Sequence, residues 1–178
     1  MLAENPRFTL LTGGARSGKS STAARLAAAS TAPVSIIATA TAEDTEMEAR
    51  IARHQADRNA AWTTIEEPLA LDQAIIAVDV DHTLIIDCLA LWVTNQITSD
   101  DDEVLARADG VARLLEQRPG TTIVVTNEVG AGIVPVNAMA RRFRDLLGSV
   151  NQRFAQGADR TLLCVAGGVV PVVEVEAL

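Results

Sequence analysis

Tyrosine is absent from this 178-residue sequence, and all aromatic residues together make up only 3% of it. Base-stacking surfaces for single-stranded nucleic acid and the aromatic belts of membrane proteins depend on such side chains. Basic residues are also few, with 15 Lys+Arg against 23 Asp+Glu and a formal net charge of -8. The composition therefore predicts a protein with no nucleic-acid partner and no affinity for anionic lipid.

Cysteine is scarce, and long uncharged runs are missing. Cys88 and Cys164 each lie in an apolar run, as expected for small buried hydrophobes, so neither a disulfide framework nor a zinc site is indicated. No uncharged run reaches the roughly 18 residues that a membrane span needs, and the amino terminus lacks the pattern of a signal peptide. We therefore expect a cytoplasmic protein without membrane insertion.

Short apolar runs rich in β-branched residues alternate with longer helical patterns, which predicts parallel β/α units. The expected strands are 8–12, 34–38, 83–87, 121–126 and 161–165, with a further candidate at 169–175. The expected helices are 19–29, 46–56, 89–97, 103–116 and 136–158. The predicted fold class is α/β, with a mostly parallel sheet flanked by helices in a single domain.

A phosphate-binding motif follows the first expected strand. The segment TGGARSGKSST contains the P-loop pattern G-x-x-x-x-G-K-[ST], whose fixed positions are occupied by Gly13, Gly18, Lys19 and Ser20. Glycines let backbone N–H groups converge on a phosphate at a helix N-terminus. We expect Lys19 to reach the β- and γ-phosphates and Ser20 to ligate Mg²⁺. The order of strand, loop and helix favours this interpretation over a glycine-rich turn without a ligand.

A P-loop enzyme also uses a carboxylate at the end of a neighbouring strand to hold magnesium and its water shell. Asp87 closes the apolar run LIID and is the candidate. Alone, a strand-terminal Asp would equally begin a turn. The P-loop favours the metal site.

The two histidines differ in setting. His82 lies in the polar turn VDVDHT and is expected to be a solvated loop residue. His54 lies in EMEARIARHQADR, a predicted helix in which Glu46, Arg50, His54 and Arg58 recur four apart on one face. Spacing alone favours an exposed, ion-paired face. Arginines beside a histidine also suit phosphate binding, and a neutral imidazole held against a phosphoryl group is a nucleophile.

Three other groups of polar residues each allow two interpretations. The acidic triplet 100–102 is interpreted as a helix N-terminus rather than a metal site. Asn127 and Glu128 end a strand, where contact with substrate and a helix-start turn are about equally expected. A solvated helix face is favoured over a phosphate clamp for Arg141, Arg142 and Arg144.

Three segments, in order between about residues 8 and 165, together resemble one enzyme family. They are TGGARSGKS, IATATAEDTEMEARIARHQADR and VVTNEVGAGIVPVNAMARRFRDLLGSVNQRFAQGAD. The sequence resembles the bifunctional adenosylcobinamide kinase / adenosylcobinamide-phosphate guanylyltransferases of cobalamin biosynthesis. The P-loop is generic, whereas the histidine helix and the TNEVGxGIVP segment are specific.

The resemblance implies a RecA-like P-loop NTPase fold, with residues 1–178 forming a single nucleotide-binding kinase/guanylyltransferase domain. It implies phosphorylation of adenosylcobinamide by ATP or GTP, followed by transfer of GMP from GTP to adenosylcobinamide phosphate, which gives adenosylcobinamide-GDP. The GMP passes through a guanylyl-histidine, which corresponds here to His54, acting with Lys19 as the catalytic pair. The family also forms homotrimers with sites between subunits.

The resemblance further implies nucleotide contacts in the P-loop and in later segments. The P-loop contacts are Gly13, Gly14, Ala15, Arg16, Ser17, Gly18, Lys19 and Ser20. The later ones are Ala38, Thr39, Ala40, Gln55, Ala56, Asp57, Arg58, Glu66 and Asp87. Ser20 and Asp87 would hold Mg²⁺, and Asp87 stands where the family has the longer Glu. Donors and charge for the phosphates would come from Arg16, Lys19, Thr39 and Arg58.

Two other functions remain open from the sequence. The chain would retain only guanylyl transfer if another protein performed the phosphorylation. Alternatively, it is a non-catalytic regulator that uses the P-loop as a nucleotide switch. The partners expected from the resemblance are adenosylcobinamide, its phosphate, GTP and ATP.

Overall fold

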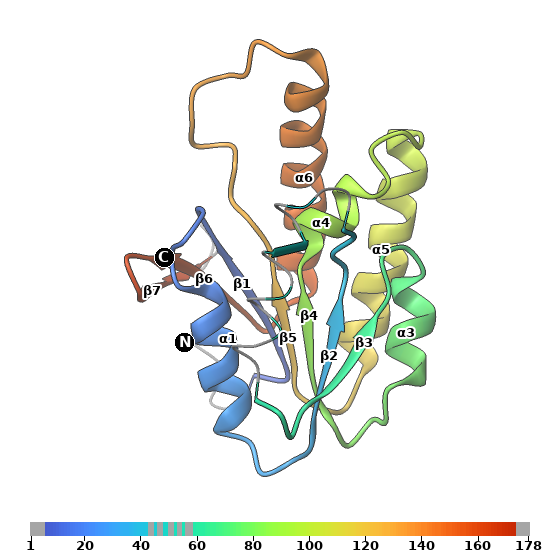
Figure 1. Ribbon diagram of the computed structural model, residues 1–178, viewed down its shortest axis with the longest axis vertical. Helices are drawn as coiled ribbons and strands as arrows, with labels where there is room; N and C mark the ends of the chain where they lie inside the picture. Colours follow the sequence, from blue (N-terminus) through green and yellow to red (C-terminus); the bar gives the residue numbers. More distant parts are fainter. Residues whose placement is uncertain are drawn as a thin grey trace.

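The computed structural model of the protein describes residues 6–42, 45, 48–49, 52, 55 and 59–173. Within them a seven-stranded sheet is flanked by helices (Figure 1). The strands are β1 (Phe8–Gly13), β2 (Val34–Ala38), β3 (Thr63–Glu66), β4 (Thr83–Asp87), β5 (Thr122–Val125), β6 (Arg160–Val165) and β7 (Gly168–Val172). Their order is β3-β2-β4-β5-β1-β6-β7, and all neighbouring pairs are parallel except β6 with β7.

The sequence pattern predicted most of these elements. The strands expected at 34–38 and 83–87 are confirmed to the residue. The described helices are α1 (Lys19–Ala28), α3 (Leu71–Ala77), α4 (Leu89–Thr94), α5 (Asp101–Gln117) and α6 (Ala138–Gly157). Neither β3 nor α3 was predicted, because β3 is a four-residue, largely exposed edge strand and α3 has only seven residues. The helix expected at 46–56 lies largely outside the described residues.

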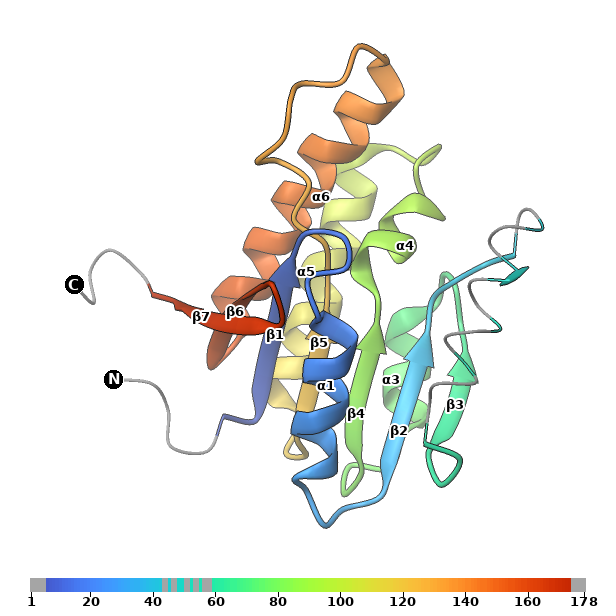
Figure 2. The ribbon, with the colours of Figure 1, turned by 60° about the vertical axis from the view of Figure 1, so that its left-hand side comes forward.

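Both faces of the sheet are covered, as the nearly continuous apolar strands require. Successive strand residues point to opposite faces, so Leu10 and Ile86 enter one apolar cluster and Leu11 and Ile85 enter the other. The first cluster includes side chains of α3, α4, α5 and α6, and the second includes side chains of α1. Figure 2 shows α1 in front of the sheet and α3, α5 and α6 behind it. None of the described helices combines the length and apolarity needed to cross a membrane.

Several polar residues have definite structural roles. Asp100 caps α5 by accepting from the Asp102 N–H at 3.0 Å, which confirms the predicted helix start. On α6, where a solvated face was expected, the Arg142 side chain is partly exposed, donates to the Ile97 carbonyl at 2.6 Å and pairs with Asp101. The expectation of a solvated His82 is wrong, because the residue is partly buried and bonded to another side chain. Its Nδ1 lies 2.8 Å from the hydroxyl of Ser35.

Parallel pairing brings the carboxyl ends of β1, β5, β4 and β2 to the same edge of the sheet. The loop after β5 rises from this edge to the start of α6, which projects beyond the sheet (Figure 1). In open α/β sheets ligands bind outside the carboxyl ends of the strands. A ligand site is therefore expected at this edge.

Candidate active site

A cavity of about 660 Å³ lies at the carboxyl edge of the sheet, a volume typical of pockets for single small ligands. The described residues that line it come from the P-loop, from the ends of β2, β3, β4 and β5, and from α4. They are Ala15, Arg16, Ser17, Gly18, Lys19, Ser20, Ser21, Ala38, Ala40, Ala42, Gln55, Glu66, Asp87, Cys88, Leu91, Val125 and Asn127. The P-loop residues and the strand-end acid Asp87 thus face one space.

Two P-loop glycines have backbone conformations that other residues rarely adopt. Gly13 has φ +146°, and a Cβ built on it would lie 2.4 Å from the carbonyl oxygen of Cys164 on β6. Gly18 has φ +100° and begins α1. A side chain at Gly13 would push the loop away from β6. The first fixed glycine of the motif is therefore required by the neighbouring strand as well as by a phosphate.

The β6–β7 hairpin supports the P-loop from a distant part of the sequence. Its two-residue turn, Ala166 and Gly167, has positive φ at both positions, as in type I′ turns. The Gly167 N–H donates to the carbonyl of Ser17 at 3.0 Å. This bond fixes the middle of the loop, and no local sequence pattern predicted it.

The Lys19 side chain folds back over the loop. Its ammonium donates to the carbonyl of Gly13 at 2.8 Å and to that of Gly14 at 2.7 Å, and the residue is only 8% exposed. Gly13 and Gly14 thus lie behind the cavity wall, where they hold Lys19. The positive charge is thereby placed inside the concave loop, where a phosphate chain would bind.

Thr39 differs from its neighbours Ala38 and Ala40, which line the cavity. Thr39 is fully buried. Its hydroxyl donates to the Cys88 carbonyl at 2.7 Å and accepts from the Cys88 N–H at 3.0 Å. The expected donation from Thr39 to a phosphate is therefore replaced by a contact that joins the end of β2 to the start of α4.

The second half of the expected nucleotide set is only partly described. His54, Ala56, Asp57 and Arg58 lie outside the described residues. Gln55 is described, and its Nε2 donates to the carboxylate of Glu66 at 2.9 Å. Both of these side chains line the cavity.

Sequence reasoning missed several lining residues that follow the ends of strands. Cys88 comes directly after Asp87, and Leu91 lies one helical turn later. Asn127 and Glu128 lie just beyond β5. Asn127 lines the cavity, whereas the Glu128 carboxylate accepts from the Gly130 N–H in a turn. Asn127 thus lies where a substrate could contact it, whereas the turn at Glu128 lies well before the start of α6 at Ala138 and is no helix start. The missed residues are Ser21, Ala42, Cys88, Leu91 and Val125; the rule that ligands bind at strand ends would have pointed to Cys88 and Val125.

The oxygen donors of the cavity suit magnesium. The Ser20 hydroxyl and the Asp87 carboxylate both line it. In the part of the chain that the structure describes, no three His, Cys, Asp or Glu side chains cluster as a metal cage would require. Magnesium is commonly held by one or two protein oxygens with waters and substrate phosphates. Ser20 and Asp87 therefore fit such an ion.

Cys88 is the thiol in the cavity, and its environment keeps it protonated. Burial, and then the charge of the adjacent Asp87, raise the pKa of the Cys88 thiol to about 11. The thiolate is the nucleophilic form of cysteine. Near neutral pH Cys88 is therefore a neutral wall residue and not a nucleophile.

Comparisons with known proteins agree with this geometry. Residues 9–172 match the family model described as cobinamide kinase / cobinamide phosphate guanyltransferase. The chain is 44% identical to the bifunctional adenosylcobalamin biosynthesis protein CobP of Pseudomonas aeruginosa, over 92% of this chain and 95% of that protein. It is 42% identical to the bifunctional adenosylcobalamin biosynthesis protein CobU of Salmonella typhimurium, over 89% and 95% respectively. The RadB recombinase structure has a TM-score of 0.52 and 14% identity, covering 89% of this chain and 74% of RadB, and shows that the two chains share a fold.

The raised pKa of Cys88 predicts slow alkylation at neutral pH. In the ligand-free protein we expect the rate of iodoacetamide modification at Cys88 to stay low through pH 9 and to rise toward pH 11, because only the thiolate reacts. Peptide mass spectrometry over a pH series measures this rate for each cysteine. A Cys88→Ser variant identifies the signal, and half-maximal reactivity near pH 8.5 would contradict the prediction.

Proposed function

Because the chain belongs to the cobinamide kinase / cobinamide phosphate guanyltransferase family, we propose that one cavity carries out both reactions of this bifunctional enzyme. The proposal is supported chiefly by the convergence of Lys19, Ser20 and Asp87 on a single space that suits one nucleotide. Both reactions begin with a nucleoside triphosphate, so one phosphate site can serve both. They differ in which phosphorus atom is attacked.

In the proposed kinase step, the terminal hydroxyl of adenosylcobinamide attacks the γ-phosphorus of ATP or GTP. The new bond joins the substrate oxygen to phosphorus, the bond to the β-phosphate oxygen breaks, ADP or GDP leaves, and the hydroxyl proton is released to solvent. Lys19 and the P-loop N–H groups hold the phosphates in line and stabilise the negative charge. Arg16, which lines the cavity, adds positive charge near the same phosphates.

In the proposed guanylyl transfer, a ring nitrogen of His54 attacks the α-phosphorus of GTP and pyrophosphate leaves. A phosphate oxygen of adenosylcobinamide phosphate then attacks the same phosphorus, the bond to imidazole breaks, and adenosylcobinamide-GDP forms. Imidazole suits this role because it is a good nucleophile and a good leaving group near its ordinary pKa. The neutral thiol of Cys88 does not compete with it. Nucleotide contacts by Gln55, Ala56, Asp57, Arg58 and Glu66 belong to this proposal.

Ser20 and Asp87 would hold Mg²⁺ beside the phosphates. Bound there, the ion would neutralise charge on the transferred group. Both residues line the same cavity, which supports the assignment.

We also propose a homotrimer in the cytoplasm, where the nucleoside triphosphates are available, with no nucleic-acid partner. The loop after β5 supports an assembly, because it exposes large apolar side chains. Ile133 is 98% exposed, Val136 is 97% exposed and Met139 at the start of α6 is 61% exposed. Exposed apolar patches of this kind mark protein interfaces.

Replacing His54 by Ala should abolish covalent labelling of the protein by GTP labelled at the α-phosphate. The wild-type label should be acid-labile and alkali-stable, as a phosphoramidate is, and GTP labelled at the γ-phosphate should leave none. His82→Ala is the matched control, because the chain has only two histidines and His82 bonds to Ser35 away from the cavity. Persistent labelling in the His54→Ala variant would move the nucleophile elsewhere. Wild-type protein that binds GTP but never becomes labelled would favour the regulator alternative.

Replacing Lys19 by Ala should reduce both activities by about 100-fold, because one phosphate cradle is shared and a loss of this size is typical for a group that stabilises transition-state charge. Phosphorylation is measured as conversion of adenosylcobinamide with ATP, and guanylylation as covalent label. Arg113→Ala removes the same charge from the exposed face of α5 and should change neither. Unchanged guanylylation in the Lys19→Ala variant would refute a shared cradle. A wild-type protein that guanylylates but does not phosphorylate would favour the single-activity alternative.

Sedimentation equilibrium should give a mass three times the chain's 18.8 kDa. The double variant Ile133→Asp, Val136→Asp should sediment as a monomer, because charge would be forced into the apolar contact. Ile76→Asp, at a side chain 70% exposed on α3, is the matched control and should remain trimeric. A monomeric wild-type protein, or a trimeric double variant, would contradict this assignment of the interface.

A further inference from the structure

Asn95, the residue that follows α4, bonds to two separate parts of the chain. The Nδ2 group of Asn95 donates to the carbonyl of Thr39 at 2.8 Å and to the carbonyl of Pro68 at 3.0 Å. Its Oδ1 accepts from the hydroxyl of Thr41 at 3.2 Å. Both amide hydrogens and the amide oxygen are thus used, so the orientation of the side chain is fixed.

These partners stand on either side of the segment that contains His54. Thr39 and Thr41 follow β2, where the chain leaves the sheet, and Pro68 follows β3, where it returns to the same edge. The N–H of Glu67 donates directly to the carbonyl of Ala38 at 3.0 Å, which joins the two parts a second time. Asn95 therefore bonds both to the chain just after β2, which precedes this segment, and to the chain just after β3, which follows it.

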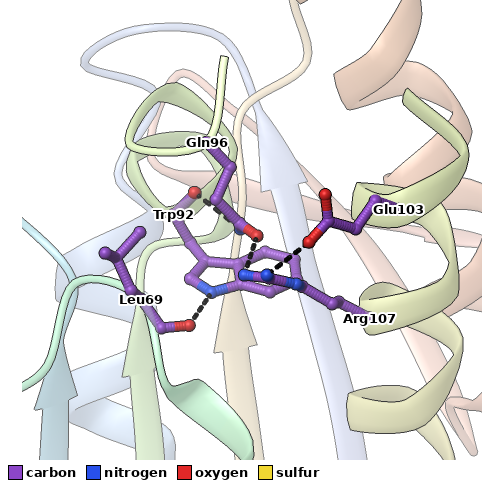
Figure 3. A network of polar contacts seen from close by, with 5 residues as sticks. All are labelled: Leu69, Trp92, Gln96, Glu103 and Arg107. Atoms are coloured by element: carbon purple, nitrogen blue, oxygen red, sulfur yellow. Dashed lines mark hydrogen bonds and ion pairs between the residues drawn. The ribbon is translucent and has the colours of Figure 1, made fainter. Parts of the chain in front are cut away.

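The helix that carries Asn95 is itself anchored (Figure 3). The indole N–H of Trp92, a residue only 1% exposed, donates to the carbonyl of Leu69 at 3.0 Å, next to the Pro68 carbonyl that Asn95 binds. Gln96 donates to the Trp92 carbonyl and accepts from Arg107 of α5 at 3.2 Å. Two consecutive carbonyls of the loop after β3 are thus tied to α4, and α4 is tied to α5.

Asn95 contacts the cavity indirectly, through the residues to which it bonds. It is not among the described residues that line the cavity, but Ala38 and Ala40 flank its partner Thr39, and Glu66 lies two residues before Pro68. These three line the cavity at the ends of β2 and β3, which lie across β4 and β5 from the P-loop, and this side is the wall opposite the P-loop. Glu66 also accepts the hydrogen bond from Gln55, the residue that follows His54.

We propose that Asn95 is a positioning residue for guanylyl transfer: it fixes the wall opposite the P-loop so that the histidine segment meets the α-phosphate in a productive geometry. This inference rests on the proposed role of His54. A displacement of about 1 Å in a reacting group can cost on the order of 10²-fold in rate. The P-loop is held instead by Gly13, Gly14 and the β6–β7 turn, so the phosphates of GTP remain bound when the amide is removed.

The test measures the transfer step and nucleotide binding separately. In the Asn95→Ala variant, the first-order rate of covalent labelling at saturating GTP should fall about 10- to 100-fold, whereas the Kd for GTP should change by a clearly smaller factor, because the phosphate cradle is intact. Asn95→Asp should be at least as slow, since a carboxylate oxygen would face the carbonyls of Thr39 and Pro68. This split between rate and affinity is the readout that general loss of stability would not produce.

Two control variants separate positioning from stability. Thr94→Ala changes the preceding, exposed residue, whose hydroxyl bonds only within α4, and should keep the wild-type rate. Leu115→Ala opens the core near the end of α5 and should lower the melting temperature, with no change in the rate below that temperature.

Each outcome decides between the two proposals. Wild-type protein that forms no covalent label would refute the guanylyl-histidine and, with it, this inference. A labelled wild type whose Asn95→Ala variant reacts at the same rate would refute only the role of Asn95. Equal slowing in the Asn95→Ala and Leu115→Ala variants would reduce Asn95 to a stabilising residue and would also overturn the inference.

Discussion

The bond between the Lys19 ammonium and the carbonyls of Gly13 and Gly14 is the contact on which the site depends. It closes the P-loop on its own lysine and places a positive charge in the concave backbone. Closure requires Gly13 at φ +146°, pressed so near the Cys164 carbonyl that a Cβ would not fit. The loop geometry therefore depends on β6, a strand from the far end of the chain, as much as on the motif itself.

The strand order explains why the remaining polar groups meet this lysine. β5 lies between β1, which leads into the P-loop, and β4, which ends in Asp87. The cavity extends from the P-loop after β1 along the ends of β5, β4, β2 and β3, with Asn127 after β5. Because parallel strands all end at the same edge, groups separated by more than a hundred residues in sequence line one wall.

The sequence predicted those parts of the site that follow from local rules. The P-loop has a fixed spacing, and Asp87 closes an apolar run, so both could be recognised from neighbouring residues. The contacts of Thr39 could not, because its hydroxyl is used by Cys88, a residue 49 positions away that only the pairing of β2 with β4 brings close. β3 was missed for a related reason: its sequence TTIE carries little apolar signal, and pairing with β2 rather than burial makes it a strand.

Different contacts hold the two sides of the cavity in place. Such independent support suits a protein with two transfer reactions. The P-loop wall is held by backbone contacts that glycine geometry makes possible, and in the proposed function it would bind the phosphates that both reactions share. The opposite wall is held by two side chains that bond across breaks between elements: Thr39 after β2 bonds to Cys88, and Asn95 after α4 bonds to Thr39 and Pro68. A phosphate cradle made of backbone tolerates little change, because its donors are the chain itself. A wall held by single amide and hydroxyl groups can be repositioned by small changes in those groups, so under the proposed mechanism the geometry of guanylyl transfer could change while the phosphates stay bound.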